Sequence, residues 1–68
     1  MKAQKYRDVV AVLKRQGWVL LRTGKGSHEV WGPPDGPGKV TIPHHREISA
    51  GVLRQVVKQL PEIPKSWR

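Results

Sequence analysis

The chain has 68 residues and no cysteine, which is enough for one small domain and excludes a disulfide framework or a thiolate zinc site. Thirteen Lys and Arg against five Asp and Glu give a formal net charge of +8, which favours a polyanion, nucleic acid first, as partner. The sequence shows neither a signal-peptide pattern nor an apolar run long enough for a membrane span, so we expect a cytoplasmic protein without a membrane partner.

The first periodic segment, residues 3–16, predicts an amphipathic helix. Its apolar side chains recur at the spacing i, i+3, i+4 and i+7, which places them on one helical face: Tyr6, Val9, Val10 and Leu13. Gly17 follows as the residue that ends the helix in a left-handed conformation.

Three short segments rich in large and β-branched residues then predict strands, at residues 18–22, 28–31 and 39–42. A Gly-rich turn, residues 23–27, and a Pro-rich connection, residues 32–38, join them. Because both connections are short, the strands form an antiparallel meander. In the second strand, alternation puts His28 and Val30 on one face of the sheet and Glu29 and Trp31 on the other.

A second amphipathic helix is predicted from the N-cap Ser49 to about Leu60, after a polar connection over residues 44–48. Its apolar face carries Val52, Leu53, Val56 and Leu60. Residues 61–68 form a tail that either folds back over the core through Ile63 and Trp67 or is disordered. We expect Trp18 to pack in or beside the core, and we leave the role of Trp31 open, because it also suits stacking on bases.

The expected fold is therefore α+β with the order α-β-β-β-α. A three-stranded antiparallel sheet carries two helices on one face, as in double-stranded-RNA-binding domains, and its other face stays open. Residues 1–68 make one domain, with a core over about residues 3–60.

The three histidines are the obvious candidates for chemistry. In an antiparallel meander, the start of the second strand lies beside the end of the third, so His28 comes to the same edge as His44 and His45. A pair of imidazoles can cleave RNA without metal, since one removes the 2′-OH proton and the other protonates the leaving 5′-oxygen.

Backbone N–H groups of Gly26 and Ser27 can cradle a phosphate, although the same loop also fits a plain hairpin turn. Four cations are candidates to bind RNA and stabilise charge at the phosphorus: Arg22, Lys25, Lys39 and Arg46.

Other chemistries fit poorly. His44 and His45 are adjacent and diverge, and no cysteine is present, so we expect no metal site and no cofactor. The five acidic residues lie on different predicted elements, which disfavours a two-magnesium nuclease. Ser27 and His28 are neighbours in sequence, an arrangement that rarely forms a nucleophile–base pair.

From Tyr6 to about Leu60, the chain resembles the HicA toxins of bacterial and archaeal HicA–HicB toxin–antitoxin pairs. The segments that carry the resemblance are Gly17-Trp18, Lys25-Gly26-Ser27-His28-Glu29-Val30-Trp31, Pro34-Asp35-Gly36, Val40-Thr41-Ile42-Pro43-His44-His45 and Gly51-Val52-Leu53-Arg54-Gln55-Val56-Val57-Lys58-Gln59.

The resemblance implies a ribosome-independent endoribonuclease that cleaves mRNA, arrests growth and is neutralised by a HicB-type antitoxin. It also implies that His28 is the catalytic residue, and that His45, in the Pro-x-His element, ranks above His44 as its helper. Some members carry a second His where this chain has Glu29, which here serves either as a carboxylate partner or only as a strand residue.

Two other functions remain open from the sequence. The first is a non-catalytic double-stranded-RNA-binding module, which normally presents a Lys cluster at the start of its second helix. The corresponding residues here are Ile48-Ser49-Ala50-Gly51-Val52, without a lysine. The second is an interaction protein whose basic face docks an acidic partner.

Overall fold

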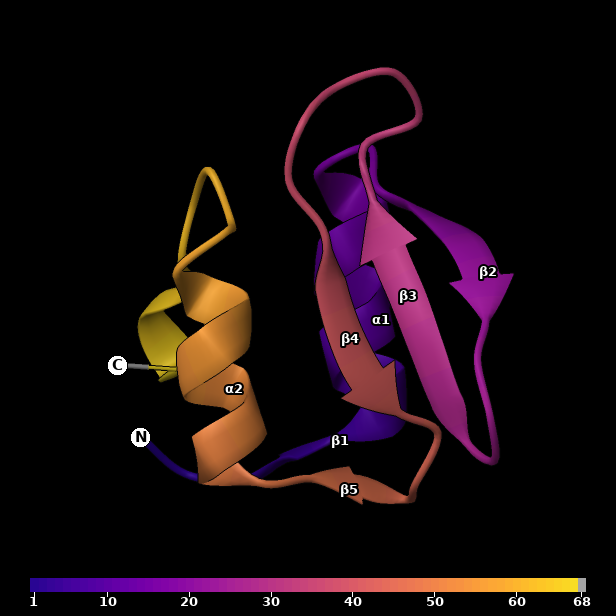
Figure 1. Cartoon of the computed structure of the whole chain (residues 1–68). Helices are drawn as coiled ribbons and strands as arrows, with labels where there is room; N and C mark the ends of the chain where they lie inside the picture. Colours follow the sequence, from indigo (N-terminus) through magenta and orange to yellow (C-terminus); the bar gives the residue numbers. More distant parts are fainter. Residues whose placement is uncertain (68) are drawn as a thin grey trace.

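The computed structural model describes residues 1–67, and its element order confirms the predicted α+β fold (Figure 1). The elements are β1 (Gln4–Lys5), α1 (Tyr6–Arg15), β2 (Val19–Thr23), β3 (His28–Gly32), β4 (Val40–Pro43), β5 (Glu47–Ile48), α2 (Ala50–Val57) and the 3-10 turn η1 (Lys65–Trp67). The predicted α-β-β-β-α order is that of α1, β2, β3, β4 and α2.

The main sheet has the antiparallel order β2-β3-β4. In β3, Glu29 pairs with Ile42 and Trp31 pairs with Val40 on the face that contacts the helices. The alternate residues His28 and Val30 therefore point to the opposite face. Figure 1 shows α1 behind the sheet and α2 alongside β4.

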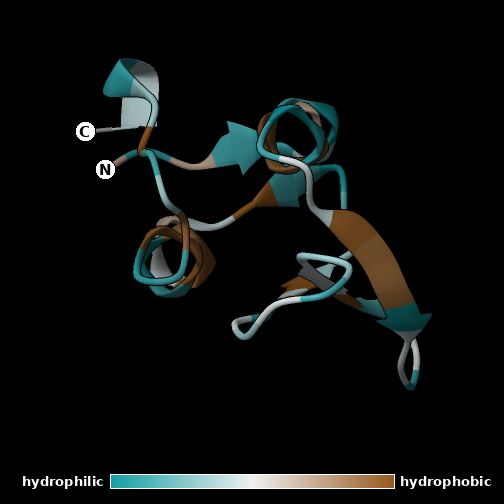
Figure 2. Cartoon of the chain, turned by 90° about the horizontal axis from the view of Figure 1, so that it is seen from above, coloured by the Kyte–Doolittle hydropathy of each residue, from teal (hydrophilic) through white to brown (hydrophobic). Residues whose placement is uncertain are grey.

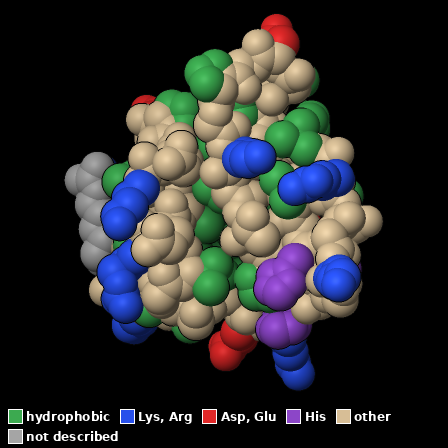
Figure 3. Space-filling model, viewed as in Figure 1, with side chains coloured by type: hydrophobic (Ala, Val, Ile, Leu, Met, Phe, Trp, Pro, Cys, Tyr) green, Lys and Arg blue, Asp and Glu red, His purple; other side chains and the backbone are tan. Residues whose placement is uncertain are grey.

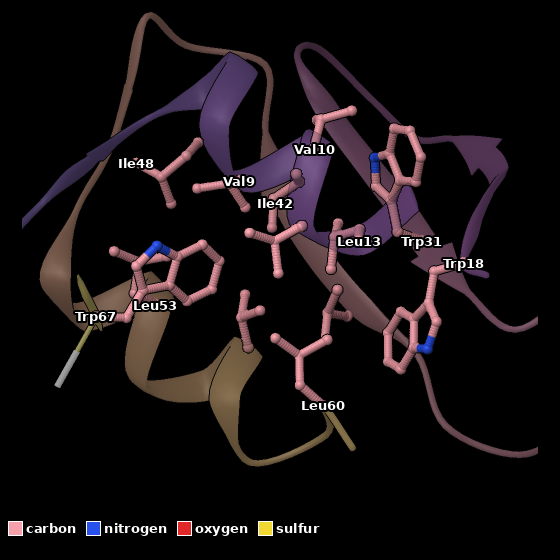
Figure 4. Packing of buried hydrophobic residues seen from close by; sticks show 13 residues of the cluster. Val9, Val10, Leu13, Trp18, Trp31, Ile42, Ile48, Leu53, Leu60 and Trp67 are labelled. Carbon is pink, nitrogen blue, oxygen red and sulfur yellow. The ribbon is translucent and has the colours of Figure 1, made fainter. Parts of the chain in front are cut away.

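Both helices share one hydrophobic core with the sheet (Figure 4). Trp18 packs in this core as predicted, and Trp31, whose role the sequence left open, is buried there as well. The side chains with the least exposure come from every layer: Leu13, Ile42, Ile48, Leu53, Val9 and Val56. Full burial of side chains of this size contributes about 1.5–3 kcal/mol each, so this cluster is the main source of stability.

The first helix begins at Tyr6, three residues later than predicted, because Gln4 and Lys5 pair with the short strand β5 instead. Gly17, with φ of 82°, ends the helix as expected, and the Trp18 amide donates to the Leu13 carbonyl at 3.0 Å. The left-handed conformation is the one that glycine adopts without steric cost.

The second helix begins after Ser49, whose hydroxyl accepts a hydrogen bond from the Val52 amide at 3.3 Å. This confirms the predicted N-cap. The helix ends at Val57 rather than near Leu60, but Leu60 is still buried in the core. None of the helices in residues 1–67 is long and apolar enough to cross a membrane.

The tail folds back over the core, which was one of the two alternatives that the sequence left open. Trp67 is only 2% exposed and belongs to the core cluster, while Ile63 packs against it. Residue 68, the last position of the predicted tail, lies outside the described residues. The segment over residues 44–48 was expected as a polar connection, but its last two residues form β5, and Ile48 is fully buried.

Candidate active site

Three segments meet at one end of the strands: the loop over residues 24–27, the start of β3 and the segment that follows β4. This region, with His28, His44 and His45, is called the histidine edge. His28 is paired with Pro43, and the His44 amide donates to the Ser27 carbonyl at 2.6 Å. Figure 3 shows histidine side chains together at the lower end of the sheet, with Lys and Arg side chains nearby. The antiparallel pairing thus brings the histidines to one edge, as the topology predicted.

His28 is exposed at the end of a tightly closed loop. The Gly24 amide donates to the His28 carbonyl at 2.8 Å, and Gly26 adopts the left-handed φ of 64° that the turn requires. The His28 Nδ1 lies 3.3 Å from the Lys25 carbonyl oxygen. Because a carbonyl oxygen only accepts, this contact needs a proton on Nδ1 and leaves the Nε2 lone pair of the neutral ring available.

His45 contacts the same loop at Ser27. Its Nε2 lies 3.0 Å from the Ser27 hydroxyl oxygen, and both histidines are exposed. The pairing of Ser27 with His45 rather than with its neighbour His28 agrees with the expectation that adjacent residues do not form such a pair. The exposed imidazoles of His28 and His45 therefore both contact this loop, His28 at Lys25 and His45 at Ser27.

His44 points to a different set of partners. Its Nδ1 lies 3.2 Å from Glu29 Oε2, and its ring stacks on Tyr6 with centroids 4.2 Å apart and 11° between the planes. The side chains of His44 and Glu29 are 61% and 10% exposed, so an open imidazole sits on a nearly buried carboxylate. His44 and His45 diverge, as predicted for adjacent residues.

Glu29 is the centre of a polar network on the helix-facing side of the sheet. Its Oε1 accepts hydrogen bonds from the Tyr6 hydroxyl at 2.6 Å and from the Trp31 indole N–H at 3.1 Å. Burial, followed by the hydrogen bond to Glu29 and the charge of that carboxylate, raises the pKa of Tyr6 to about 12. Glu29 thus contacts the side chains of Tyr6, Trp31 and His44 rather than only occupying a position in β3.

The predicted cations are distributed unevenly. Lys25 lies in the loop itself, and Arg22 pairs with Val30, which puts it on the same face of the sheet as His28. Arg46 follows His45, and its carbonyl accepts from the Tyr6 amide at 3.0 Å. Lys39 precedes β4 at its other end, about 13 Å along the strand from Pro43, so the fold does not bring it to the histidine edge.

Within residues 1–67, no three His, Cys, Asp or Glu side chains gather in a way that could hold a metal ion. The sequence predicted Tyr6 only as a core-facing residue of the first helix, ranked His44 below His45, and did not show the central position of Glu29. The one available signal was the alternation of β3, which put Glu29 on the face of Trp31. A carboxylate on a core-facing position needs partners, but their identity depends on how α1 docks.

The fold and the histidine edge define a small, strongly basic α+β domain with the topology of double-stranded-RNA-binding domains. A family model described as "HicA toxin of bacterial toxin-antitoxin" matches residues 6–60. The chain belongs to the HicA toxin family, and is therefore a toxin of a toxin–antitoxin system. No curated protein and no solved structure gives a significant match.

Proposed function

We propose that the toxin is a ribosome-independent, metal-independent endoribonuclease that cleaves mRNA in the cytoplasm and is neutralised by a HicB-type antitoxin. The observation that carries this proposal is the exposed His28 at the end of a basic Gly-rich loop, with His45 in contact with Ser27 of the same loop. A charge of +8 on so small a domain supports a polyanionic substrate.

In the proposed reaction, one imidazole removes the proton of an RNA 2′-hydroxyl, whose oxygen then attacks the adjacent phosphorus. The second imidazole protonates the leaving 5′-oxygen, which gives a 2′,3′-cyclic phosphate and a 5′-hydroxyl end. His28, with Nε2 available, suits either role, and His45 is its helper. Backbone N–H groups at Gly26 and Ser27 hold the phosphate, while Lys25, Arg22 and Arg46 offset its developing charge. Lys39 binds RNA farther along the strand.

The test compares the wild type with His28→Ala on a defined single-stranded RNA, with a chelator present throughout. We expect the wild type to cleave at the same rate with and without chelator, and His28→Ala to be slower by about 100-fold or more. The same RNA with 2′-deoxy substitution at the cleaved nucleotide serves as the control and should remain intact.

A folded His28→Ala variant that still cleaves, or still arrests growth, would refute the assignment of His28. Loss of wild-type cleavage on adding chelator would refute the metal-independent reaction. A wild type that binds RNA at low salt without cleaving it would favour the non-catalytic double-stranded-RNA-binding module.

A further inference from the structure

The first strand of the main sheet, β2, has a free edge. Among residues 1–67 it pairs only with β3, and all five of its residues, Val19–Thr23, are exposed. Figure 1 shows β2 at the outer side of the sheet, away from α2. The opposite edge strand, β4, lies beside α2, so the two edges of the sheet differ in how well they are covered. A free edge presents unpaired N–H and C=O groups to any strand that approaches.

This edge is also apolar. Val19, Leu20 and Leu21 are consecutive in sequence and are 42%, 44% and 44% exposed. Figure 2 shows this strand as an outlying hydrophobic ribbon. Leu20 pairs with Trp31 and borders a shallow, mainly apolar depression that Trp18 also lines. In a small monomeric protein, three adjacent exposed apolar residues beside such a depression mark an interaction surface.

The charges around β2 indicate which partner this edge binds, a second copy of the chain or a different protein. Residues 14–28 contain no Asp or Glu and four cations, namely Lys14, Arg15, Arg22 and Lys25. A second copy that paired with β2 would bring these cations against their equivalents, with a net charge of +8 on each chain. An acidic segment from a different protein satisfies both the apolar strand and the surrounding charge.

We propose that β2 is the docking edge for the antitoxin. An extended segment of that protein adds a fourth strand to the sheet, inserts an apolar side chain into the depression beside Trp18 and Trp31, and places acidic side chains against the cations. Main-chain hydrogen bonds supply affinity in this mode, and the pockets supply specificity. The identity of the partner as an antitoxin rests on the proposed function.

The position of β2 connects docking with neutralisation. The strand ends at Thr23, where the loop that carries Lys25 and leads to His28 begins. A segment paired along β2 therefore ends beside that loop and obstructs the approach of RNA to His28. Neutralisation then needs no rearrangement of the histidine edge itself.

The test is hydrogen–deuterium exchange of the toxin alone and in complex with the antitoxin encoded beside it. We expect strong slowing of exchange at the amides of residues 19–23 in the complex. The variant Leu20→Glu should weaken antitoxin binding by at least 10-fold and keep its RNA cleavage. The control Ala11→Glu places the same charge on an exposed position of α1 and should bind within 2-fold of the wild type.

Protection at another surface, with β2 exchanging as in the free toxin, would overturn the proposal, and so would unchanged binding by Leu20→Glu. The proposal would also be overturned if sedimentation showed that the toxin alone is a dimer and hydrogen–deuterium exchange showed β2 protected in that dimer. The edge would then belong to a second copy of the chain. The RNA-cleavage assay reports separately on the proposed function: a toxin that cleaves no RNA and still protects β2 in the complex refutes only the ribonuclease.

Discussion

His28 and Glu29 are consecutive residues of β3 whose side chains leave the sheet on opposite faces. The histidine is exposed, and its Nδ1 lies 3.3 Å from the carbonyl oxygen of Lys25. The glutamate is buried and is in contact with the Tyr6 hydroxyl, the Trp31 indole and the His44 imidazole. Adjacent residues of one strand thus carry an exposed imidazole and a buried carboxylate with three partners.

The difference separates two kinds of polar residue. A buried carboxylate must have hydrogen-bond donors, because leaving such a group unpaired costs more than a hydrogen bond contributes. An exposed imidazole has no such need, so its place on a basic loop is not explained by stability. Substitutions on the His28 face should therefore change RNA cleavage, and substitutions on the Glu29 face should change the free energy of unfolding.

The largest expected effect concerns the histidine edge. Replacing His45 with Ala should slow RNA cleavage by on the order of 100-fold, because it removes the second acid–base group of the proposed reaction. The matched control His44→Ala removes an imidazole from the neighbouring position and should slow cleavage by less than about 3-fold, since His44 faces Glu29 instead. Equal losses for both variants would contradict the division of roles between them.

The next effect concerns the buried side. Glu29→Ala should lower the free energy of unfolding by about 2 kcal/mol, because it leaves the buried Trp31 N–H without its acceptor. His28→Ala should change the same quantity by less than about 0.5 kcal/mol, as for exposed residues generally. Urea denaturation followed by tryptophan fluorescence measures both. A larger loss of unfolding free energy in His28→Ala than in Glu29→Ala would contradict the separation between the exposed and the buried face.

Tyr6→Phe is a gentler probe of the same network. It removes only the hydroxyl that donates to Glu29 at 2.6 Å and keeps the ring that stacks on His44. We expect a loss of about 1.5 kcal/mol in the free energy of unfolding at neutral pH, the lower end of the range for a hydrogen bond to a charged group. RNA cleavage by the folded variant should stay within about 2-fold of the wild type, because the ring still supports His44.

The smallest expected effect is on pH dependence. The pKa of Tyr6 is raised from 10.0 to about 12 in the folded chain, so folding favours the protonated phenol. Its contribution is fully present below the unfolded pKa and is lost as the pH rises through the folded one. Between about pH 9 and about pH 11, the wild type should therefore lose more stability than Tyr6→Phe, in parallel urea titrations. Equal slopes would show that the Tyr6 pKa is the same in both states.

Much of the fold followed from local patterns. The helical spacing of Tyr6, Val9, Val10 and Leu13, the cap at Ser49 and the glycine after α1 each have a local cause that one segment contains. The paired strands β1 and β5 were missed because two residues are too few to show a period. The helix α2 ends at Val57, three residues before the predicted end near Leu60.

The candidate site was predictable in part. The meander placed His28 at the same edge as His44 and His45, because strand order alone decides which ends meet. The order alone did not show that His45 contacts Ser27 and that His44 contacts Glu29. Both contacts depend on the conformation of the turn after β4. The contact of His44 also depends on the ring of Tyr6, on which His44 stacks and which α1 supplies.

The sequence by itself determined the charge, the two amphipathic helices, the three strands and a histidine on a basic Gly-rich loop, because each is a property of neighbouring residues. Only the tertiary structure decided that Glu29 joins Tyr6, Trp31 and His44, and that Trp67 closes the core. Tyr6 and Glu29 are 23 residues apart, and their contact exists only after α1 docks on the sheet. Docking is set by the shape of the whole core, which no single segment encodes.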